Sequence, residues 1–254
     1  MPLSDDQKLR YQRNILIPGF GEEAQAKLAA ARVAIVGLGG LGSPAAFYLA
    51  AAGVGELGLF DPDIVELSNL QRQVLHATPD LGRPKAVSAA ETIARLNPEV
   101  RTTTAQLRLA EANAREALDG YDVVVEATDN FAAKFLLNDV CLDLGKPLAV
   151  AGILSLSGQA QFIVPGAVPC LRCAVADVPE GVPTTSEEGV LGAVPGILGS
   201  IEALEVIRWI VGLWRPRADG TGALHSVDGE TMRLNTLRVR RRPTCRCARL
   251  WSTP

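Results

Sequence analysis

Four glycines near residue 40 have a spacing that suits phosphate binding. Gly37, Gly39, Gly40 and Gly42 follow an apolar, mostly β-branched run at 33–36 and precede an alanine-rich stretch at 44–52. A glycine turn between a strand and a helix lets backbone N–H groups and the helix N-terminus approach a phosphate group. Asp61 ends the next expected strand, where a carboxylate can bind a ribose hydroxyl. The pattern predicts a nucleotide site, and it fits an NAD-dependent dehydrogenase as well as an ATP enzyme.

Three charged side chains have the chemistry of a polyphosphate site. Arg72 and Lys85 supply positive charge, and Asp129 offers an oxygen ligand of the kind that Mg²⁺ takes. Each has a structural alternative: Asp129 as a helix N-cap, Lys85 as cover for a first helical turn, and Arg72 as a surface ion-pair partner. Their shared position at strand ends or helix starts, where open α/β sheets bind ligands, favours the site.

Two close pairs of cysteines, Cys170 with Cys173 and Cys245 with Cys247, offer ligands for a metal. The C-x-x-C spacing of the first pair suits two thiolates on one tetrahedral zinc ion, and in a reducing compartment such pairs indicate a metal site rather than disulfides. Four thiolates leave no open position for catalysis, so structural zinc is expected. The alternative is two pairs of buried or free thiols without metal, and Cys141 is expected to be an ordinary helix thiol.

The elements that position these residues alternate along the chain. After a short helix that follows Ser4 and a helix at 22–31, strands are predicted at 33–36, 57–60, 100–104, 122–126 and 147–152, and helices at 44–52, 85–96, 111–118 and 130–144. This alternation predicts an α/β fold, a doubly wound, mostly parallel, Rossmann-like sheet with helices on both faces. Beyond residue 152 we expect C-terminal antiparallel strands and a zinc-bound tail, from a strand at 158–164, a Gly/Pro-punctuated stretch at 170–192, a helix at 197–212 and a hairpin of 223–227 with 232–239.

The composition bounds the class of protein. Of 254 residues, 48% are hydrophobic and 21% charged, and the formal net charge is −3. These values exclude a disordered or fibrous protein and argue against a general nucleic-acid binder. We expect one domain over 1–254, with a nucleotide-binding half at 1–152 and a carrier-binding and zinc half at 153–254. Neither a secretory signal nor a run long enough to span a membrane is evident, so a soluble, cytoplasmic protein is expected.

An ordered set of short motifs carries a resemblance to a known family. It includes 10–13 (RYQR), 68–73 (SNLQRQ), Lys85, 127–130 (ATDN), 145–148 (GKPL), 158–159 (GQ) and 169–173 (PCLRC). With the glycine turn, this set resembles the MoeB/ThiF/HesA family, the bacterial relatives of ubiquitin-activating enzymes, and it is most similar to the MoeB type that serves molybdopterin synthase. The resemblance runs from about Leu9 to about Cys247.

The resemblance implies an adenylyltransferase activity. It implies that MgATP adenylates the C-terminal glycine carboxylate of a ubiquitin-like sulfur carrier of the MoaD/ThiS type, which ends in Gly-Gly, and that pyrophosphate is released. Asp129 would bind Mg²⁺, Arg72 and Lys85 would neutralise the phosphates, and Arg13 would reach the site across a homodimer interface. Residues implied to surround the nucleotide are Gly37, Gly39, Gly40, Gly42, Asp61, Ser68, Asn69, Leu70, Gln71, Arg72, Lys85, Asp129 and Asn130, and those implied to bind zinc are Cys170, Cys173, Cys245 and Cys247.

The chain departs from the family pattern at two places. Cys245 and Cys247 are separated by one residue where the family has two, and Thr185 stands where many relatives carry a loop cysteine. A hydroxyl cannot act as a thiolate does, so adenylation without a covalent carrier intermediate is expected. The chain ends at Pro254 without the rhodanese domain of some relatives, so a separate sulfur donor, a cysteine desulfurase or a rhodanese, is expected.

Other functions remain open from the sequence. The basic run Arg238, Arg240, Arg241 and Arg242 weakly favours a related enzyme that activates a carboxylate on modified tRNA. The same run could instead be a solvated strand face or a contact for the acidic surface of a partner protein. A NAD(P)-dependent oxidoreductase leaves Arg72, Lys85 and Asp129 without a task. A non-catalytic scaffold for ubiquitin-like proteins would not need the MgATP residues. The pathway, whether molybdopterin, thiamine or tRNA thiolation, is not indicated.

Overall fold

One eight-stranded sheet organises the chain. The computed structural model describes residues 3–177, 181 and 183–250, apart from the side chain of Ser186. The strand order is β3-β2-β1-β4-β5-β6-β7-β8, and the first five strands in that order are parallel. The strands are β1 (Arg32–Val36), β2 (Glu56–Phe60), β3 (Arg101–Ala105), β4 (Val123–Glu126), β5 (Leu148–Leu154), β6 (Ser157–Ile163), β7 (Gly222–Asp228) and β8 (Arg233–Val239).

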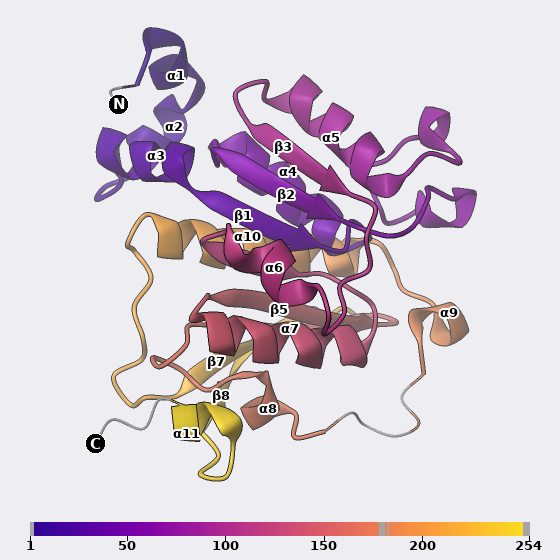
Figure 1. Ribbon diagram of the computed structural model, residues 1–254, viewed down its shortest axis with the longest axis vertical. Coiled ribbons are helices and arrows are strands. Elements are labelled where there is room, and N and C mark those ends of the chain that lie inside the picture. The colour runs from indigo at the N-terminus through magenta and orange to yellow at the C-terminus, as the bar shows by residue number, and fades with distance from the viewer. Residues whose placement is uncertain (1–2, 178–180, 182, 251–254) are drawn as a thin grey trace.

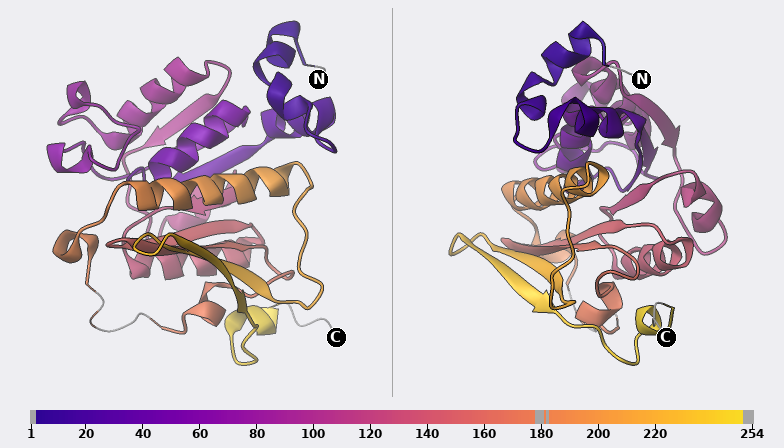
Figure 2. Two further views of the ribbon diagram at one scale, coloured as in Figure 1. Left: turned by 180° about the vertical axis from the view of Figure 1, so that it is seen from behind. Right: turned by 90° about the vertical axis from the view of Figure 1, so that its left-hand side faces the viewer.

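Helices cover both faces of the parallel strands because these strands are apolar on both sides. In β1, Val33 and Ile35 belong to one buried cluster, whereas Ala34 and Val36 belong to the other. Figures 1 and 2 show α6 (Ala114–Asp119) and α7 (Phe131–Leu144) on one face and α4 (Gly42–Ala52) and α10 (Ala193–Ile210) on the other. The expected doubly wound sheet is therefore confirmed.

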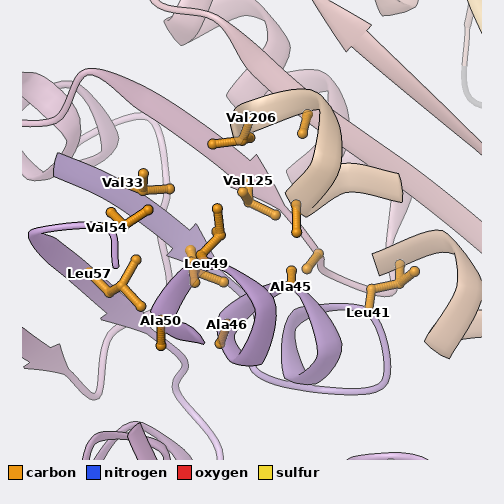
Figure 3. Close-up of a cluster of buried hydrophobic side chains, with 14 of the residues drawn as sticks. Val33, Leu41, Ala45, Ala46, Leu49, Ala50, Val54, Leu57, Val125 and Val206 are labelled. Atoms are coloured by element: carbon orange, nitrogen blue, oxygen red, sulfur yellow. The ribbon is translucent and has the colours of Figure 1, made fainter. Parts of the chain in front are cut away.

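The helix after the glycine turn lies close to the sheet because its buried side chains are small. Ala45, Ala46 and Ala50 of α4 are completely buried, and Figure 3 shows Ala45, together with Leu49, on the side of the helix that faces Val33 and Val125 of the central strands. Short side chains let the helix axis approach the strands, which brings the start of α4 to the end of β1. The parallel half also contains α3 (Gly21–Ala30) and α5 (Lys85–Leu96).

The C-terminal part extends the same sheet with antiparallel strands, as expected. β5 runs through residue 152, pairs with β6, and β7 and β8 continue to the edge. The stretch at 170–192 contains two short helices, α8 (Leu171–Ala174) and α9 (Thr185–Glu188), and the chain after β8 forms α11 (Arg246–Leu250). α10 begins at Ala193 and not at 197, because Pro195 falls in its first turn, where proline is tolerated.

The two ends of the sheet carry different parts of the chain. Figure 1 places α1 (Asp5–Arg10) and α2 (Gln12–Ile15) at the end where β1 begins, and α9 at the end where the parallel strands stop. Among the described residues, no helix has both the length and the apolar character that crossing a membrane requires.

Candidate functional site

A pocket opens at the carboxyl ends of the parallel strands, where the strand order reverses between β1 and β4. It is lined by the segments that follow β1, β2, β3 and β4, together with Ile153 of β5 and Thr185 of α9. The predicted nucleotide residues that line it are Gly37, Gly39, Gly40, Asp61, Arg72, Lys85, Asp129 and Asn130.

The glycine turn is shaped by close backbone contacts. Gly37 has a φ of +94°, and a Cβ there would lie 2.6 Å from the carbonyl oxygen of Ala127. A Cβ on Gly42 would lie 1.9 Å from the carbonyl oxygen of Gly37. Gly42 does not line the pocket, and its lack of a side chain lets α4 start against the turn. Gly39 and Gly40 also line the pocket, and a Cβ on either would have its nearest contact at 3.5 Å and 3.3 Å, respectively.

Buried side chains bind both backbone polar groups of Leu38 in this turn. Asp61 accepts the Leu38 N–H at 2.7 Å, and His76 Nε2 lies 3.0 Å from the Leu38 carbonyl oxygen. Since a carbonyl only accepts, Nε2 carries the proton, and His76 Nδ1 lies 2.8 Å from the Ser88 hydroxyl. Burial, with a smaller contribution from the Lys85 charge, lowers the pKa of His76, which favours the neutral imidazole. The sequence did not predict this role for His76.

Two predicted cations face the pocket. Arg72 donates to the Ser68 carbonyl oxygen at 3.1 Å, and within the described part of the chain no carboxylate pairs with it. Lys85 is buried at the start of α5, with Nζ 3.3 Å from an oxygen of Asp63, which also lies 4.0 Å from Arg108. Asp63 and Arg108 line the pocket as well. The charged side chains of the lining are three basic ones, Arg72, Lys85 and Arg108, and three acidic ones, Asp61, Asp63 and Asp129. The lining is therefore balanced in formal charge, and it offers cations for an anion as well as carboxylates for a metal ion.

Asn130, and not Asp129, caps the helix that follows β4. The N-cap of α7 is Asn130, whose side-chain oxygen accepts the Ala133 N–H at 2.8 Å. Asp129 is exposed on the pocket wall, and among residues 3–177, 181 and 183–250 its carboxylate has no hydrogen-bond or ion-pair partner. The capping alternative for Asp129 is wrong, and its carboxylate remains available for a cation.

Several predicted residues lie outside the pocket lining. Ser68, Asn69, Leu70 and Gln71 form the turn before Arg72, and Gln71 Nε2 is 3.5 Å from the Val190 carbonyl oxygen. Asn69 is buried and its side chain accepts the Glu66 N–H at 3.2 Å. These contacts hold the turn and join it to the segment after α9. Arg13 is exposed on α2 and does not line the pocket.

The segment after α9 is fixed beside the pocket. Ser155, which follows β5, donates its N–H to the Gly189 carbonyl oxygen at 3.0 Å and accepts the Leu191 N–H at 3.2 Å. These bonds bring Thr185 to the pocket wall. The described residues that line the pocket include no cysteine.

The four paired cysteines converge at a separate site. Their sulfur atoms lie within 4.8 Å of one another, and the Cys170–Cys245 and Cys173–Cys247 distances are 3.5 Å. Zinc–sulfur bonds of about 2.3 Å place the ligands of a tetrahedral ion about 3.8 Å apart, so the cluster fits zinc. The short spacing at 245–247 reaches the cluster because α11 begins between the two cysteines.

Protons are shared unevenly in this cluster. Burial raises the pKa of Cys173 to about 11, whereas thiol hydrogen bonds, chiefly from Cys170, lower the pKa of Cys247 to about 5. A dication would displace the remaining protons. Cys141 lies apart, and burial raises its pKa to about 12, which agrees with an inert helix thiol.

A family model describes nearly the whole of this architecture. The ThiF family model matches residues 11–247. The chain belongs to the ThiF family. The resemblance drawn from the short motifs is thereby confirmed.

Named ThiF-type relatives are similar over most of the chain. It is 44% identical to the "SAMP-activating enzyme E1" of Haloferax volcanii, covering 93% of this chain and 87% of that protein. It is 43% identical to the "Sulfur carrier protein adenylyltransferase" of Thermus thermophilus, covering 93% and 89%. It is 45% identical to the "Adenylyltransferase and sulfurtransferase MOCS3" of Mus musculus, covering 96% of this chain and 53% of that protein. The chain thus spans about half the length of the mouse relative.

Solved structures share the fold. E. coli MccB superposes with a TM-score of 0.82 at 23% identity, over 96% of this chain and 74% of that one. PaaA gives a TM-score of 0.77 at 25% identity, over 93% and 75%. The ThiF-type fold is therefore shared with proteins of low sequence identity.

Some residues of the ThiF-type pocket were not predicted. Asp63, Gln73, Leu107, Arg108 and Leu109 line it. Asp63 and residues 107–109 follow the ends of β2 and β3, so the rule that ligands bind at the carboxyl ends of parallel strands was a usable signal. For Gln73, the only indication in the sequence was that it follows Arg72.

Proposed function

We propose that this protein adenylates the C-terminal carboxylate of a ubiquitin-like sulfur carrier with ATP. The observation that carries the proposal is the Asp129 carboxylate, which has no partner among the described residues and lies in the same pocket as Arg72, Lys85 and the glycine turn. A nicotinamide cofactor needs no such set, whereas MgATP needs both the cations and the metal ligand. Membership of the ThiF family, with relatives named as carrier adenylyltransferases, supports the same choice.

The reaction brings together two anions, and the pocket residues reduce their repulsion. A carboxylate oxygen of the carrier attacks the α-phosphorus, a carbonyl–oxygen–phosphorus linkage forms, and the bond between the α-phosphorus and its bridging oxygen breaks as pyrophosphate leaves. Arg72 and Lys85 neutralise charge on the phosphates, and the charge that develops on pyrophosphate makes this help largest in the transition state. Gly39 and Gly40 let the nucleotide approach the backbone, and Asp61 holds the turn beneath it and offers its remaining lone pairs to the ribose.

Asp129 is the residue that would hold Mg²⁺. Mg²⁺ binds proteins through one or two carboxylates beside phosphate oxygens and water, and an exposed carboxylate without a partner suits that role. When bound, the ion neutralises phosphate charge. Asn130, Ser68, Asn69, Leu70 and Gln71 are assigned to the surroundings of the nucleotide, where they support the loops that carry Asp129 and Arg72.

A second copy of the chain would complete the site. Arg13 belongs to α2, at the end of the sheet opposite α9, so one chain does not bring it to its own pocket (Figure 1). An apolar groove between α4 and α10 is lined by Tyr48, Leu204 and Leu234, which are 57%, 55% and 61% exposed. Exposed apolar surface of this kind marks a protein interface. We assign it to a homodimer in which Arg13 of each chain serves the other's pocket.

The carrier and its sulfur come from other proteins. We assign carrier binding and zinc to 153–254 and nucleotide binding to 1–152. The four clustered cysteines would hold zinc in the reducing cytoplasm, and Cys141 is buried, so no cysteine is left to carry sulfur to the adenylate. A separate donor, a cysteine desulfurase or a rhodanese, would supply it.

The basic run gives no support to the tRNA alternative. Arg238 pairs with Asp219 at 3.5 Å, Arg241 donates to the Gly166 carbonyl oxygen at 2.9 Å, and Arg242 donates to the Arg172 carbonyl oxygen at 3.4 Å. These guanidinium groups hold the C-terminal segment against the body of the chain. Among the described residues, only Arg240 of the four is exposed without such a contact. One free arginine does not make the basic stripe that nucleic acid requires.

Calorimetry with ATP and with NAD tests the nucleotide part of the proposal. ATP should bind, magnesium should strengthen its binding, and NAD should bind weakly or not at all. Asp129→Asn should lose the magnesium effect, whereas Asp122→Asn, an exposed aspartate at the other end of β4, should keep it. Tight NAD binding without ATP binding would overturn the assignment.

A further inference from the structure

A buried group of ionisable side chains lies beneath the pocket and does not line it. Glu126 is the last residue of β4, Lys134 lies in α7, and Glu202 lies in α10. The side chains of Glu126 and Lys134 are 0% and 8% exposed, and Glu202 is 1% exposed. Charges buried this deeply are costly unless they are paired, so the arrangement calls for a function or a structural compensation.

Glu126 and Lys134 form an ion pair that holds the backbone of Thr128 at both its N–H and its carbonyl oxygen. Lys134 Nζ lies 2.7 Å from Glu126 Oε2 and donates to the carbonyl oxygens of Thr128 at 2.7 Å and Ala151 at 2.5 Å. Glu126 Oε1 accepts the Thr128 N–H at 2.9 Å and also the Thr128 hydroxyl. Both backbone polar groups of Thr128 are therefore bound to this pair.

No other anchor is visible for this part of the loop. The β4 ladder ends with the bond from the Ala127 N–H to the Val36 carbonyl oxygen, and α7 begins after Asn130. Among the described residues, the only hydrogen bonds to the Thr128 backbone come from Glu126 and Lys134. The next residue is Asp129. A shift of the Thr128 peptide would move the Asp129 carboxylate with it.

We propose that Glu126 and Lys134 are positioning residues that hold Asp129 in place for metal-dependent nucleotide binding, acting through the Thr128 peptide. The proposal rests on the proposed function for its metal, but the contact it describes exists without any ligand. Second-layer groups of this kind orient metal ligands, and their loss typically weakens metal binding 10- to 100-fold.

Glu202 is not part of the pair. Neither of its carboxylate oxygens has a hydrogen-bond partner in the part of the chain that the structure describes. Burial and the nearby Glu126 charge raise its pKa well above the usual value, against the opposing effect of Lys134, which favours the neutral, protonated form of Glu202. Lys134 thus pairs with Glu126 and not with Glu202. Glu202→Gln is therefore expected to leave the positioning of Asp129 unchanged.

Lys146 provides a matched control for Lys134. It also donates to backbone carbonyl oxygens beside β4, those of Asp119 at 2.7 Å and Tyr121 at 2.5 Å, but at the amino end of that strand. Lys134→Met and Lys146→Met remove the same charge and the same type of contact at opposite ends of one strand. Only the first is expected to affect Asp129.

Two measurements on these variants test the proposal. Hydrogen exchange followed by mass spectrometry should show faster exchange in peptides covering 127–130 for Lys134→Met, and not for Lys146→Met or Glu202→Gln. The strengthening of binding of a non-hydrolysable ATP analogue by magnesium should fall at least tenfold in Lys134→Met, about 1.4 kcal/mol, and should stay normal in both controls. In an Asp129→Asn background, Lys134→Met should cause no further loss. With Asp129 intact, Lys134→Arg should keep part of the magnesium effect that Lys134→Met loses.

The outcomes separate this proposal from the function on which it rests. The positioning role alone would be overturned if magnesium strengthens nucleotide binding in the wild type, and if Lys134→Met shows the same magnesium effect and the same hydrogen exchange as the wild type. A wild type without nucleotide binding would overturn the proposed function and the metal role together, while the exchange data would still judge the anchoring of Thr128. If Lys134→Met does not fold, Glu126→Gln, which removes the charge but keeps an acceptor, takes its place with the same expectations.

Discussion

Replacing the buried acid Glu202 by glutamine should stabilise the protein and remove part of its pH dependence. Glu202 is 1% exposed, both of its oxygens lack a partner among the described residues, and its pKa is raised well above 4.5 by burial and by the Glu126 charge. A glutamine has the same shape and no proton to lose. Glu202→Gln should therefore behave like the protonated wild type at every pH.

The sign and size of the effect follow from proton linkage. In the unfolded chain the carboxyl ionises near pH 4.5, whereas in the folded chain it stays protonated to higher pH. Above pH 4.5, ionisation of this carboxyl therefore stabilises the unfolded state relative to the folded state. Compared with Glu202→Gln, the wild type loses about 1.4 kcal/mol of stability per pH unit until the folded-state pKa is reached. The loss corresponds to about 3–5 °C in melting temperature per pH unit for a chain of this size.

Urea unfolding of both proteins at several pH values between 4.5 and 8 measures this difference. The stability gap between Glu202→Gln and the wild type should be small near pH 4.5 and should widen with pH at the stated slope. Glu111→Gln, which alters an exposed carboxyl, should show no widening gap. A gap that does not depend on pH, or a variant that is less stable at neutral pH, would refute the description of Glu202 as a neutral buried acid.

Four further expectations follow from the site and its surroundings. Gly42→Ala should destabilise by about 1–3 kcal/mol or more, since its Cβ would lie 1.9 Å from a carbonyl oxygen, whereas Gly39→Ala, with its nearest contact at 3.5 Å, should melt near the wild type and bind ATP weakly. Cys173→Ser should lose zinc by metal analysis and melt at a lower temperature; metal-free wild type purified without chelators would contradict this. Leu204→Glu should yield monomers in sedimentation, and an intact dimer would exclude the groove as the interface. Thr185→Ala should leave carrier adenylation largely intact, and a hundredfold loss, about 2.7 kcal/mol of barrier, would show direct participation of the loop.

The fold could be predicted from the sequence because its signals are local. The helix at Lys85–Leu96 was predicted with its exact bounds, since Pro84 precedes it and Asn97-Pro98 follows it. The start of α10 was missed because a proline and a glycine near its beginning look like helix breakers. Only packing against α4 and the sheet shows that this proline lies in a first turn.

The site was predictable where its residues follow strand ends and obscure where they act through tertiary contacts. Asp61 comes directly after β2 and Asp129 is the third residue after β4, so their place at the pocket could be expected. His76 lies in an irregular segment and binds the carbonyl oxygen of Leu38, which is far away in the sequence. Lys134 lies in a helix and binds the carbonyl oxygen of Thr128 in the preceding turn. No local sequence pattern indicates contacts of this kind. Arg13 had no signal beyond family resemblance, because the structure of one chain leaves it outside the pocket.

The central claim is that this pocket activates the carboxylate of a protein with ATP. Its most direct test is ATP–pyrophosphate exchange, measured with labelled pyrophosphate and a ubiquitin-like protein from the same genome that ends in Gly-Gly. Exchange should require the carrier, should disappear when its C-terminal carboxylate is converted to an amide, and should fall sharply in Asp129→Asn while carrier binding persists. Exchange that persists with the amidated carrier, or at the normal rate in Asp129→Asn, would contradict the account.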